Sequence, residues 1–508
     1  MLDNYLEASL QNKLKLLSVL HTNRTIATKT LGQILQLGPA AINTLIEEIN
    51  EDVQGLAVIH ADPFQLTLNT EEGVYFFHLF RAICTHSSVL RCLKFLLLNN
   101  NGRAFSRFID EAYLTKSSAY RARQACIDYL HCIGLEIENN CVIGREYRIR
   151  FLMGLLHYKY GIDCYQADAN DLRIVRRFIL ATNHVVDMDY LEQTENEYGY
   201  FEYLIILAWK RKDHPLSPML SDQLKQLKSL SLYDEFIDAV HNHLEPALPC
   251  RFNDLDLDYT YLVYCCTNSC VFGDRWNQEN IQAVSRIVFG DPAYADLVDR
   301  LKNRFGEKFV QSHALRAVLI YFYKKCLLEL QCIIPDKNFF VDTPQNPLSI
   351  QFLNLLTDFL NEWREDNNIQ YRLDSNHLIY LSLQMENILR QTVQPVPVYI
   401  LSDLFADMNV LKLHIARQIS DQRISLHTFL LNGEDHSILK GLENCVIIAH
   451  KKFEGILTRM GIDKKNTLIP ITAELNNNER YAIHTAINHY EDCQFAALIQ
   501  PPEKHPEN

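Results

Sequence analysis

Leucines recur at helical spacing over residues 9–21, and two more segments with helical periodicity follow before residue 53. Pro39 opens the third of these segments, at a first-turn position where the missing N–H costs nothing. The alternating stretch LAVIHADPFQLTL then predicts two short strands with a turn near Asp62. Helix, helix, turn, helix and hairpin predict a winged helix-turn-helix module over residues 1–70.

The same order of elements recurs over residues 71–163. Residues 74–99 and 103–112 have helical periodicity, and a longer helix is expected over residues 117–134 (SSAYRARQACIDYLHCIG). LEIENNCVI predicts a hairpin that turns at its Asn-Asn pair, and GREYRIRFLMGLLHYKYG returns to helix. A second winged module is therefore predicted.

The helix over residues 117–134 has two different faces when its side chains are placed at 100° per residue. Its apolar stripe, expected to be buried, consists of Ala119, Ala122, Cys126, Leu130 and Ile133. The first turns of the other face carry hydroxyl, amide and guanidinium groups, which bond phosphates and base edges in a major groove. We expect DNA contacts from Ser117, Ser118, Tyr120, Arg121, Arg123 and Gln124, and phosphate contacts from Arg103, Arg107 and Lys116. Of these, Arg123 lies near the apolar edge and has to extend outward to reach DNA.

Charge is distributed unevenly along this acidic chain, whose net charge is −13. Residues 73–160 contain 12 Lys and Arg against 6 Asp and Glu, whereas residues 1–72 contain 4 against 9. A basic island in an acidic protein indicates either a surface for a polyanion or a locally solvated helical face. In the first module, the third helix carries four carboxylates that would repel phosphate, so we expect that module to contact DNA weakly or only to position the second.

Helical periodicity dominates the middle of the chain. A weak break in this periodicity near residues 285–295 predicts two helical bundles, over 164–285 and 286–392. After a proline-bearing linker, four apolar runs alternate with helical stretches, which predicts a small parallel α/β domain over 393–502. A tail follows at 503–508. The fold class is thus mainly α and multidomain, as a chain of 508 residues requires.

Several classes of protein are disfavoured by what the sequence lacks. It has no signal-like N-terminus, no apolar run long enough to cross a bilayer, and no nucleotide-binding or hydrolase motif. Its 14 cysteines are scattered, as expected for free thiols in a reducing cytoplasm. We expect a cytoplasmic protein that is not an enzyme, with no cofactor and no bound metal.

The order of elements resembles the Mga/AtxA virulence regulators of Gram-positive bacteria. The closest local similarity is the second module, in which Gly144, Glu146, Tyr147, Arg148, Ile149 and Arg150 match the family's G-x-E-Y-R-I-R segment. The resemblance implies a transcription regulator, acting as an activator, that binds double-stranded DNA as a homodimer.

The resemblance also implies that the bundles are similar to phosphotransferase-system regulation domains (PRDs), whose histidines receive phosphate from a phosphocarrier protein. WKRKDHPL looks like the family's R-x-x-x-H stretch and makes His214 the first candidate; His377 and His313 follow. A phosphoryl group adds about −1.5 to −2 charge, which Lys210, Arg211 and Lys212 are expected to bind.

The α/β domain resembles the enzyme IIB component of sugar transport systems, which carries a phospho-accepting cysteine after its first strand. Ser402 stands at that place here, and Cys445 begins a later strand. The domain is therefore expected to dimerise the chain rather than transfer phosphate. Two alternatives to the DNA-binding regulator stay open: an RNA-binding antiterminator under PRD control, and a non-catalytic interaction scaffold related to the phosphotransferase system.

Overall fold

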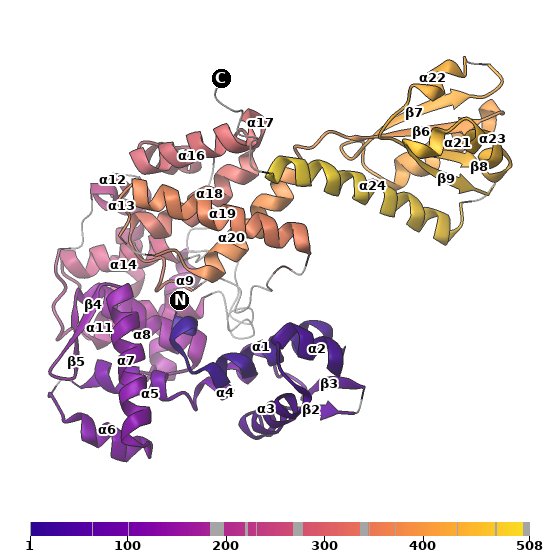
Figure 1. Ribbon diagram of the computed structural model, residues 1–508. Helices are drawn as coiled ribbons and strands as arrows, with labels where there is room; N and C mark the ends of the chain where they lie inside the picture. The colour runs from indigo at the N-terminus through magenta and orange to yellow at the C-terminus, as the bar shows by residue number, and fades with distance from the viewer. Residues whose placement is uncertain are drawn as a thin grey trace, which may run out of the picture. The chain divides into compact units, whose positions relative to one another are not determined.

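The computed structural model is mainly helical (Figure 1). It describes residues 2–62, 64–99, 101–182, 198–218, 222–229, 231–267, 278–335, 344, 346–370, 372–433, 435–472 and 475–500. The tail predicted at 503–508 lies outside these residues. The chain divides into two compact units: residues 1–296, 319–343 and 361–380 form the first, and residues 297–318, 344–360 and 381–508 form the second. In the described part of the chain, none of the helices combines the length and apolar character that a membrane span needs.

The first winged module follows the predicted order of helices and hairpin, with one additional strand, β1. After a short turn of 3₁₀ helix, its three helices carry a three-stranded antiparallel sheet with the strand order β1-β3-β2. The elements are η1 (Leu2–Tyr5), α1 (Ala8–Asn23), β1 (Thr25–Ala27), α2 (Thr28–Leu35), α3 (Pro39–Asp52), β2 (Ala57–Ala61) and β3 (Gln65–Thr70). Leu10, Leu14 and Leu17 on α1 are buried, as the helical spacing of leucines predicts.

The second winged module also has the predicted order. The helical segment predicted over residues 74–99 consists of two helices, and the Ser87 side chain caps the second of them by accepting a hydrogen bond from the Leu90 amide. The elements are α4 (Phe76–Cys84), α5 (Ser88–Leu98), α6 (Phe105–Ala112), α7 (Lys116–Cys132), β4 (Leu135–Glu138), β5 (Cys141–Gly144) and α8 (Glu146–Tyr160). The hairpin turns at Asn139 and Asn140, whose φ angles of 50° and 60° suit the mirror-image turn that joins twisted strands.

Helix α8 is buried along nearly its whole length and packs against α11. Gly154 makes their close approach possible, since a Cβ atom there would lie 2.8 Å from Leu204 Cδ2 and 2.9 Å from Tyr200 Cε2. The helices that follow in the chain are α9 (Ala169–Thr182), α11 (Gly199–Lys210), α12 (Asp222–Leu227), α13 (Ser231–Ala239), η2 (Val240–Leu244), η3 (Glu245–Ala247), α14 (Asp254–Cys266), α15 (Gln278–Phe289), α16 (Pro292–Phe305), α17 (Glu307–Val310), α18 (His313–Leu327), α19 (Pro347–Asp366) and α20 (Ser375–Arg390).

The C-terminal part of the second unit is an α/β domain with four parallel strands in the order β7-β6-β8-β9. All four strands predicted from the sequence form. One face of the sheet packs against α21 and α24, and the other packs against α22 and α23. The elements are β6 (Val396–Ser402), α21 (Phe405–Gln418), β7 (Ile424–Leu430), α22 (Ser437–Lys440), β8 (Val446–His450), η5 (Lys451–Phe453), α23 (Glu454–Arg459), η6 (Ile462–Lys464), β9 (Thr467–Ile471) and α24 (Asn477–Ile499).

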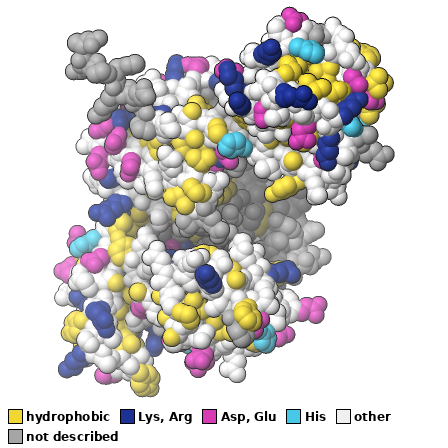
Figure 2. All heavy atoms as spheres, turned by 45° about the vertical axis from the view of Figure 1, so that its right-hand side comes forward, with side chains coloured by type: hydrophobic (Ala, Val, Ile, Leu, Met, Phe, Trp, Pro, Cys, Tyr) yellow, Lys and Arg dark blue, Asp and Glu magenta, His cyan; other side chains and the backbone are white. Residues whose placement is uncertain are grey.

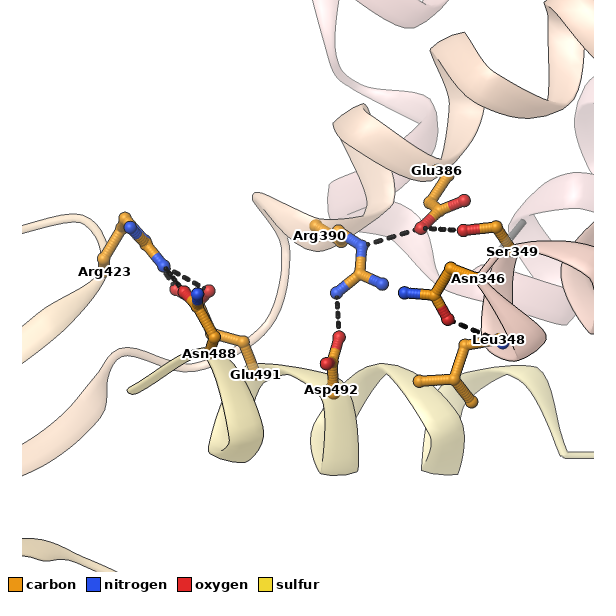
Figure 3. A network of polar contacts seen from close by, with 9 residues as sticks. All are labelled: Asn346, Leu348, Ser349, Glu386, Arg390, Arg423, Asn488, Glu491 and Asp492. Atoms are coloured by element: carbon orange, nitrogen blue, oxygen red, sulfur yellow. Dashed lines mark hydrogen bonds and ion pairs between the residues drawn. The ribbon is translucent and has the colours of Figure 1, made fainter. Parts of the chain in front are cut away.

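Helix α24 holds this sheet to the helices of the same unit (Figure 3). Arg423, next to β7, bonds Glu491 at 2.6 Å, while Arg390 at the end of α20 bonds Asp492 at 2.8 Å. At the far end of α24, the Arg304 guanidinium donates hydrogen bonds to the carbonyls of residues 498–500. A cation at a helix C-terminus satisfies carbonyls that have no partner within the helix and interacts favourably with the helix dipole.

Candidate nucleic-acid interface and regulatory site

Helix α7 presents a polar face at its N-terminal end. The predicted apolar stripe from Ala119 to Ile133 is buried. Thr115 caps the helix by accepting a hydrogen bond from the Ser118 amide at 3.2 Å. The side chains left exposed are Lys116, Ser117, Tyr120, Arg121 and Gln124, whereas Ser118 is half-buried. Five of the predicted contact residues are thus gathered on one solvent-facing surface.

Short-range hydrogen bonds orient two of these side chains. Arg121 Nη2 lies 3.4 Å from Ser118 Oγ, and Gln124 Nε2 donates to Asp128 Oδ1 at 2.8 Å. Both partners lie on α7 itself, and Arg121 also lines a cavity that residues 5–8 and the start of α5 share with it. We call the exposed residues Lys116, Ser117, Tyr120, Arg121 and Gln124 the α7 face.

Arg123 is placed differently from the α7 face. It is half-buried, its guanidinium carbon lies 5.7 Å from the centre of the Phe105 ring, and its Nε is buried without a hydrogen-bond partner among the described residues. The side chain thus packs α7 against α6 by a cation–π contact. Reaching DNA would require it to leave this position, so the geometry lends no support to the expected contact.

The predicted phosphate-binding residues on and before α6 are exposed but not equivalent. Arg107 forms an ion pair with Glu111 at 2.6 Å, so part of its charge is neutralised. The Arg103 amide donates to Asn99 Oδ1 at 2.8 Å, which fixes its backbone and leaves its side chain exposed. Asn99 Nδ2 in turn donates to the carbonyls of Arg103 and Asn140. This buried asparagine fastens the tip of the wing to the start of α6, a role that no local sequence pattern indicates.

The basic island of residues 73–160 is only partly a surface feature. Arg148, Arg150 and Lys159 are buried, each in an ion pair with a carboxylate. The wing strand β4 exposes Glu136 and Glu138 instead. These three cations are therefore not available to a polyanion, and the accessible cations concentrate near α6 and at the start of α7.

The first module has carboxylates on its third helix, as expected. Glu47 and Glu51 are exposed, but Glu48 and Asp52 each lie 2.9 Å from the Lys13 ammonium on α1. These ion pairs reduce the repulsion that α3 would exert on phosphate without making the helix attractive.

A buried ionic network joins α8 to α11 beside His214. Glu146 accepts hydrogen bonds from Arg150 Nε at 3.0 Å and from Arg211 Nε and Nη2 at 2.7 and 2.9 Å. Arg150 Nη2 donates to the carbonyls of Arg211 and His214, and Arg150 Nη1 is buried without a hydrogen-bond partner among the described residues. The Glu146 and Arg150 of the sequence motif are therefore structural residues of the interior.

His214 itself is half-buried at the edge of this network. Burial and the neighbouring Arg211 cation lower the pKa of its imidazole, which favours the neutral form of the ring. Two of the three cations expected to bind a phosphoryl group here are already engaged, since Lys210 pairs with Asp171 and Arg211 with Glu146. Lys212 is exposed.

The other two candidate histidines differ in accessibility. His313 is exposed at the start of α18. His377 is buried, with Nε2 lying 3.1 Å from the Lys325 ammonium, and burial together with that cation lowers the pKa of His377 well below its usual value. A phosphocarrier protein cannot reach His377 in this conformation.

In the α/β domain, Ser402 lies at the carboxyl end of β6 and accepts a hydrogen bond from the Leu404 amide. It lines a cavity of about 550 Å³ together with His450 and Arg480. Cys445 is buried at the opposite end of the sheet, where it contacts Asn466 at 3.0 Å, and burial raises its pKa to about 11. Neither residue places a reactive thiolate after the first strand. Within the described ranges, no cluster of three or more His, Cys, Asp or Glu is arranged to hold a metal ion.

Comparison with known families matches two segments of the chain. A model of the Mga helix-turn-helix domain matches residues 74–157, which contain α4–α8. A model of the M protein trans-acting positive regulator (MGA) PRD domain matches residues 174–389. No curated protein gives a significant match.

Proposed function

Because the chain belongs to the Mga/AtxA family of PRD-containing, DNA-binding transcription regulators, we propose that it activates transcription by inserting the start of α7 into the major groove. Members of this family are transcription regulators and not enzymes.

The observation that carries the proposal is the α7 face. A capped helix N-terminus with exposed Lys116, Ser117 and Arg121 combines a positive dipole end, a hydroxyl and two cations, all of which favour phosphate. Gln124 and Arg121 also have the amide and guanidinium groups that read adenine and guanine edges. The alternative of an RNA-binding antiterminator expects a small β-rich domain at the N-terminus, whereas α1–α3 there form a winged helical module.

Replacing Arg121 with alanine tests the DNA contact. If Arg121 contacts a phosphate or a base, Arg121→Ala lowers the affinity for a promoter fragment by about 1–3 kcal/mol at fixed salt. Loss of a phosphate contact also flattens the dependence of log K on log salt by about one unit.

Arg177→Ala is the matched control, because Arg177 is exposed on α9 outside the winged modules. It should leave both the affinity and the salt slope unchanged. Equal affinities of the wild type and Arg121→Ala would refute the assignment. Tighter binding to a structured RNA than to the duplex would favour the antiterminator.

We place the dimer interface on the α/β domain. Its helix α21 packs one side against the sheet, yet Phe405, Val410 and Leu413 on its other side are 68%, 56% and 70% exposed. Leu404, which precedes α21 directly, adds to the exposed apolar area at the start of this helix, and Figure 2 shows hydrophobic side chains gathered on the α/β domain, at the upper right. Exposed apolar surface of this kind marks interaction sites, and a second copy of the chain is the occupant that the family suggests.

For control by phosphorylation, the structure favours His214 over the buried His377. A phosphoryl group on His214 would bring negative charge next to Arg150 and Arg211 and compete with Glu146 for them. Because Arg150 belongs to α8, this competition would transmit the change from the PRD region to the DNA-binding module.

Phosphorylation in vitro tests this assignment. With phosphoenolpyruvate and the general phosphotransferase proteins, His214→Ala should lose most of the acid-labile phosphate of the wild-type chain. His377→Ala should keep the wild-type amount of phosphate, because its imidazole is not accessible. If His214→Ala keeps the full amount of phosphate and His313→Ala loses it, the phosphorylation site is His313, the exposed histidine of α18.

A further inference from the structure

Two thiols from distant parts of the chain meet at the C-terminal end of α7. Cys132 Sγ lies 3.9 Å from Cys332 Sγ. The Tyr129 hydroxyl donates a hydrogen bond to the Cys332 carbonyl at 3.1 Å, and the Cys332 thiol contacts the Arg372 carbonyl at 3.0 Å. The Tyr129 hydrogen bond holds the backbone of Cys332 against α7, and the Arg372 carbonyl holds its sulfur, so the two sulfurs are kept as neighbours. The Arg148 guanidinium strengthens this junction by bonding the Glu329 carboxylate at 2.8 Å.

The two cysteines differ in access. Cys132 is half-buried and open to a small solute, whereas Cys332 is only 5% exposed. An oxidant therefore reaches Cys132 first, and Cys332 lies behind it in the position of a resolving thiol. Such an arrangement, with an accessible reactive thiol beside a second one, is typical of redox-sensitive cysteines.

The surroundings of Cys132 also favour its thiolate. A hydrogen bond with the Cys332 thiol lowers the pKa of Cys132, burial opposes this effect, and the Tyr5 hydroxyl lowers the pKa further. By contrast, burial raises the pKa of the Cys84, Cys126 and Cys266 thiols, which are enclosed in the core. Since the thiolate is the nucleophile, these shifts favour Cys132 over the three enclosed thiols as the first site of oxidation.

We propose that Cys132 and Cys332 form a reversible disulfide when the protein meets a peroxide, and that this bond locks the end of α7 to the segment after α18. The site differs from the α7 face and from the histidines, so it does not depend on the function proposed above.

The reaction balances with a peroxide as oxidant. The Cys132 thiolate attacks one peroxide oxygen, an S–O bond forms, the O–O bond breaks and hydroxide leaves, which gives a sulfenic acid. The Cys332 sulfur then attacks the Cys132 sulfur and displaces hydroxide, which takes up the proton of the Cys332 thiol to give water. Two thiols lose two electrons in total, and one hydrogen peroxide is reduced to two waters once the first hydroxide takes up a proton from solvent.

Only a small movement is required to form the bond. A disulfide needs an S–S distance of about 2.05 Å, and side-chain rotation can supply much of the approach from 3.9 Å. The disulfide joins two residues that are 200 positions apart in the sequence. Closing such a loop reduces the conformational entropy of the unfolded chain far more than that of the folded chain. The oxidised protein should therefore be more stable, with its α7 C-terminus held in place.

Mass spectrometry of the full-length protein tests the bond directly. Reduced protein is treated with hydrogen peroxide, and the remaining thiols are blocked with N-ethylmaleimide. Two fewer blocked thiols are expected, together with a cross-linked peptide pair containing Cys132 and Cys332. Chymotrypsin cuts after Tyr129 and so separates Cys132 from Cys126, while a glutamate-specific protease cuts after Glu329 and separates Cys332 from Cys326.

Single-cysteine variants test which thiols form the cross-link. Cys132→Ser should abolish the cross-link, whereas Cys493→Ser, which removes an exposed thiol on α24, should leave it intact. The peptide map of the wild type needs no variant, so the test stands even if a substitution disturbs folding. Pairing of Cys132 with another cysteine, or its conversion to sulfinic acid while Cys332 stays free, would overturn the proposal.

The lock has a measurable consequence of its own. Oxidised wild-type protein should unfold at a higher temperature than reduced protein, and amide exchange in the second half of α7 should slow. Dithiothreitol should reverse both effects, and neither should occur in Cys132→Ser. A cross-linked protein with unchanged exchange in α7 would show that the bond forms without acting as a lock.

Discussion

At the scale of single residues, buried charged side chains connect helices of this protein to one another. Glu146 accepts from Arg150 and Arg211, all three side chains are buried, and the three residues come from α8 and the end of α11. Removing one partner of such a network leaves the others as uncompensated charges in the interior, which costs several kcal/mol. The network therefore connects the DNA-binding module to the PRD region. A phosphoryl group added beside it would change the electrostatic energy of these buried ion pairs.

His377 gives a prediction about pH. Because burial and Lys325 lower its pKa well below the usual value of 6.5, the folded state keeps the imidazole neutral where the unfolded chain already binds a proton. The stability from the neutral ring is present above about pH 6.5 and is lost as the pH falls below it, by up to about 1.4 kcal/mol per pH unit. His377→Gln should therefore show a smaller fall in unfolding free energy between pH 7.5 and 5.5 than the wild type.

Urea unfolding at the two pH values measures this difference. His313→Gln is the control, since His313 is exposed and its replacement should leave the pH dependence as in the wild type. An unchanged pH dependence in His377→Gln would mean that the imidazole is not held neutral in the folded state.

At the scale of elements, the spacing between α8 and α11 depends on the missing side chain of Gly154. Helix propensity alone predicts that alanine stabilises a helix interior by about 1 kcal/mol relative to glycine. The added Cβ would meet buried Leu204 and Tyr200 at less than 3 Å, and such overpacking costs about 1–3 kcal/mol. We expect Gly154→Ala to lower the unfolding free energy and Gly154→Val to lower it more.

Thermal or urea unfolding tests this order. Gly455 in α23 offers the matched control, because no described residue from another part of the chain lies within 4 Å of the position of its added Cβ. Gly455→Ala should leave the stability of its own unit unchanged or slightly raised. A gain in stability for Gly154→Ala would show that α11 can move away at little cost.

At the scale of the whole molecule, the exposed apolar side of α21 predicts that the chain forms a dimer through this helix. Leu413→Asp places a charge at the 70% exposed position and should shift the protein from dimer to monomer in light scattering. Because two linked DNA-binding modules raise each other's effective concentration, the variant should also bind a two-site DNA fragment more weakly, with single-site affinity unchanged.

Ile350→Asp controls for the added charge, since Ile350 is exposed on α19 outside the α/β domain. It should keep the wild-type mass. A wild-type mass for Leu413→Asp as well would place the interface elsewhere on the chain.

The amino-acid sequence by itself determined the order of elements. Local signals suffice for this: periodicity marks helices such as α1 and α7, alternation and an Asn-Asn turn mark the wing, and four apolar runs mark β6–β9. The buried stripe and the polar face of α7 also follow from the sequence, because 100° per residue fixes which side chains share a side.

Tertiary structure alone decided which charges face solvent. Arg121 and Arg123 are two residues apart in one helix, yet the first is exposed and the second stacks on Phe105 of α6. Arg148 pairs with Glu329, 181 residues along the chain, and Arg150 shares Glu146 with Arg211, which lies 65 residues from that carboxylate. Partners that are distant in sequence leave no local pattern, and neither does the meeting of Cys132 with Cys332, because burial and ion pairing are properties of packed elements.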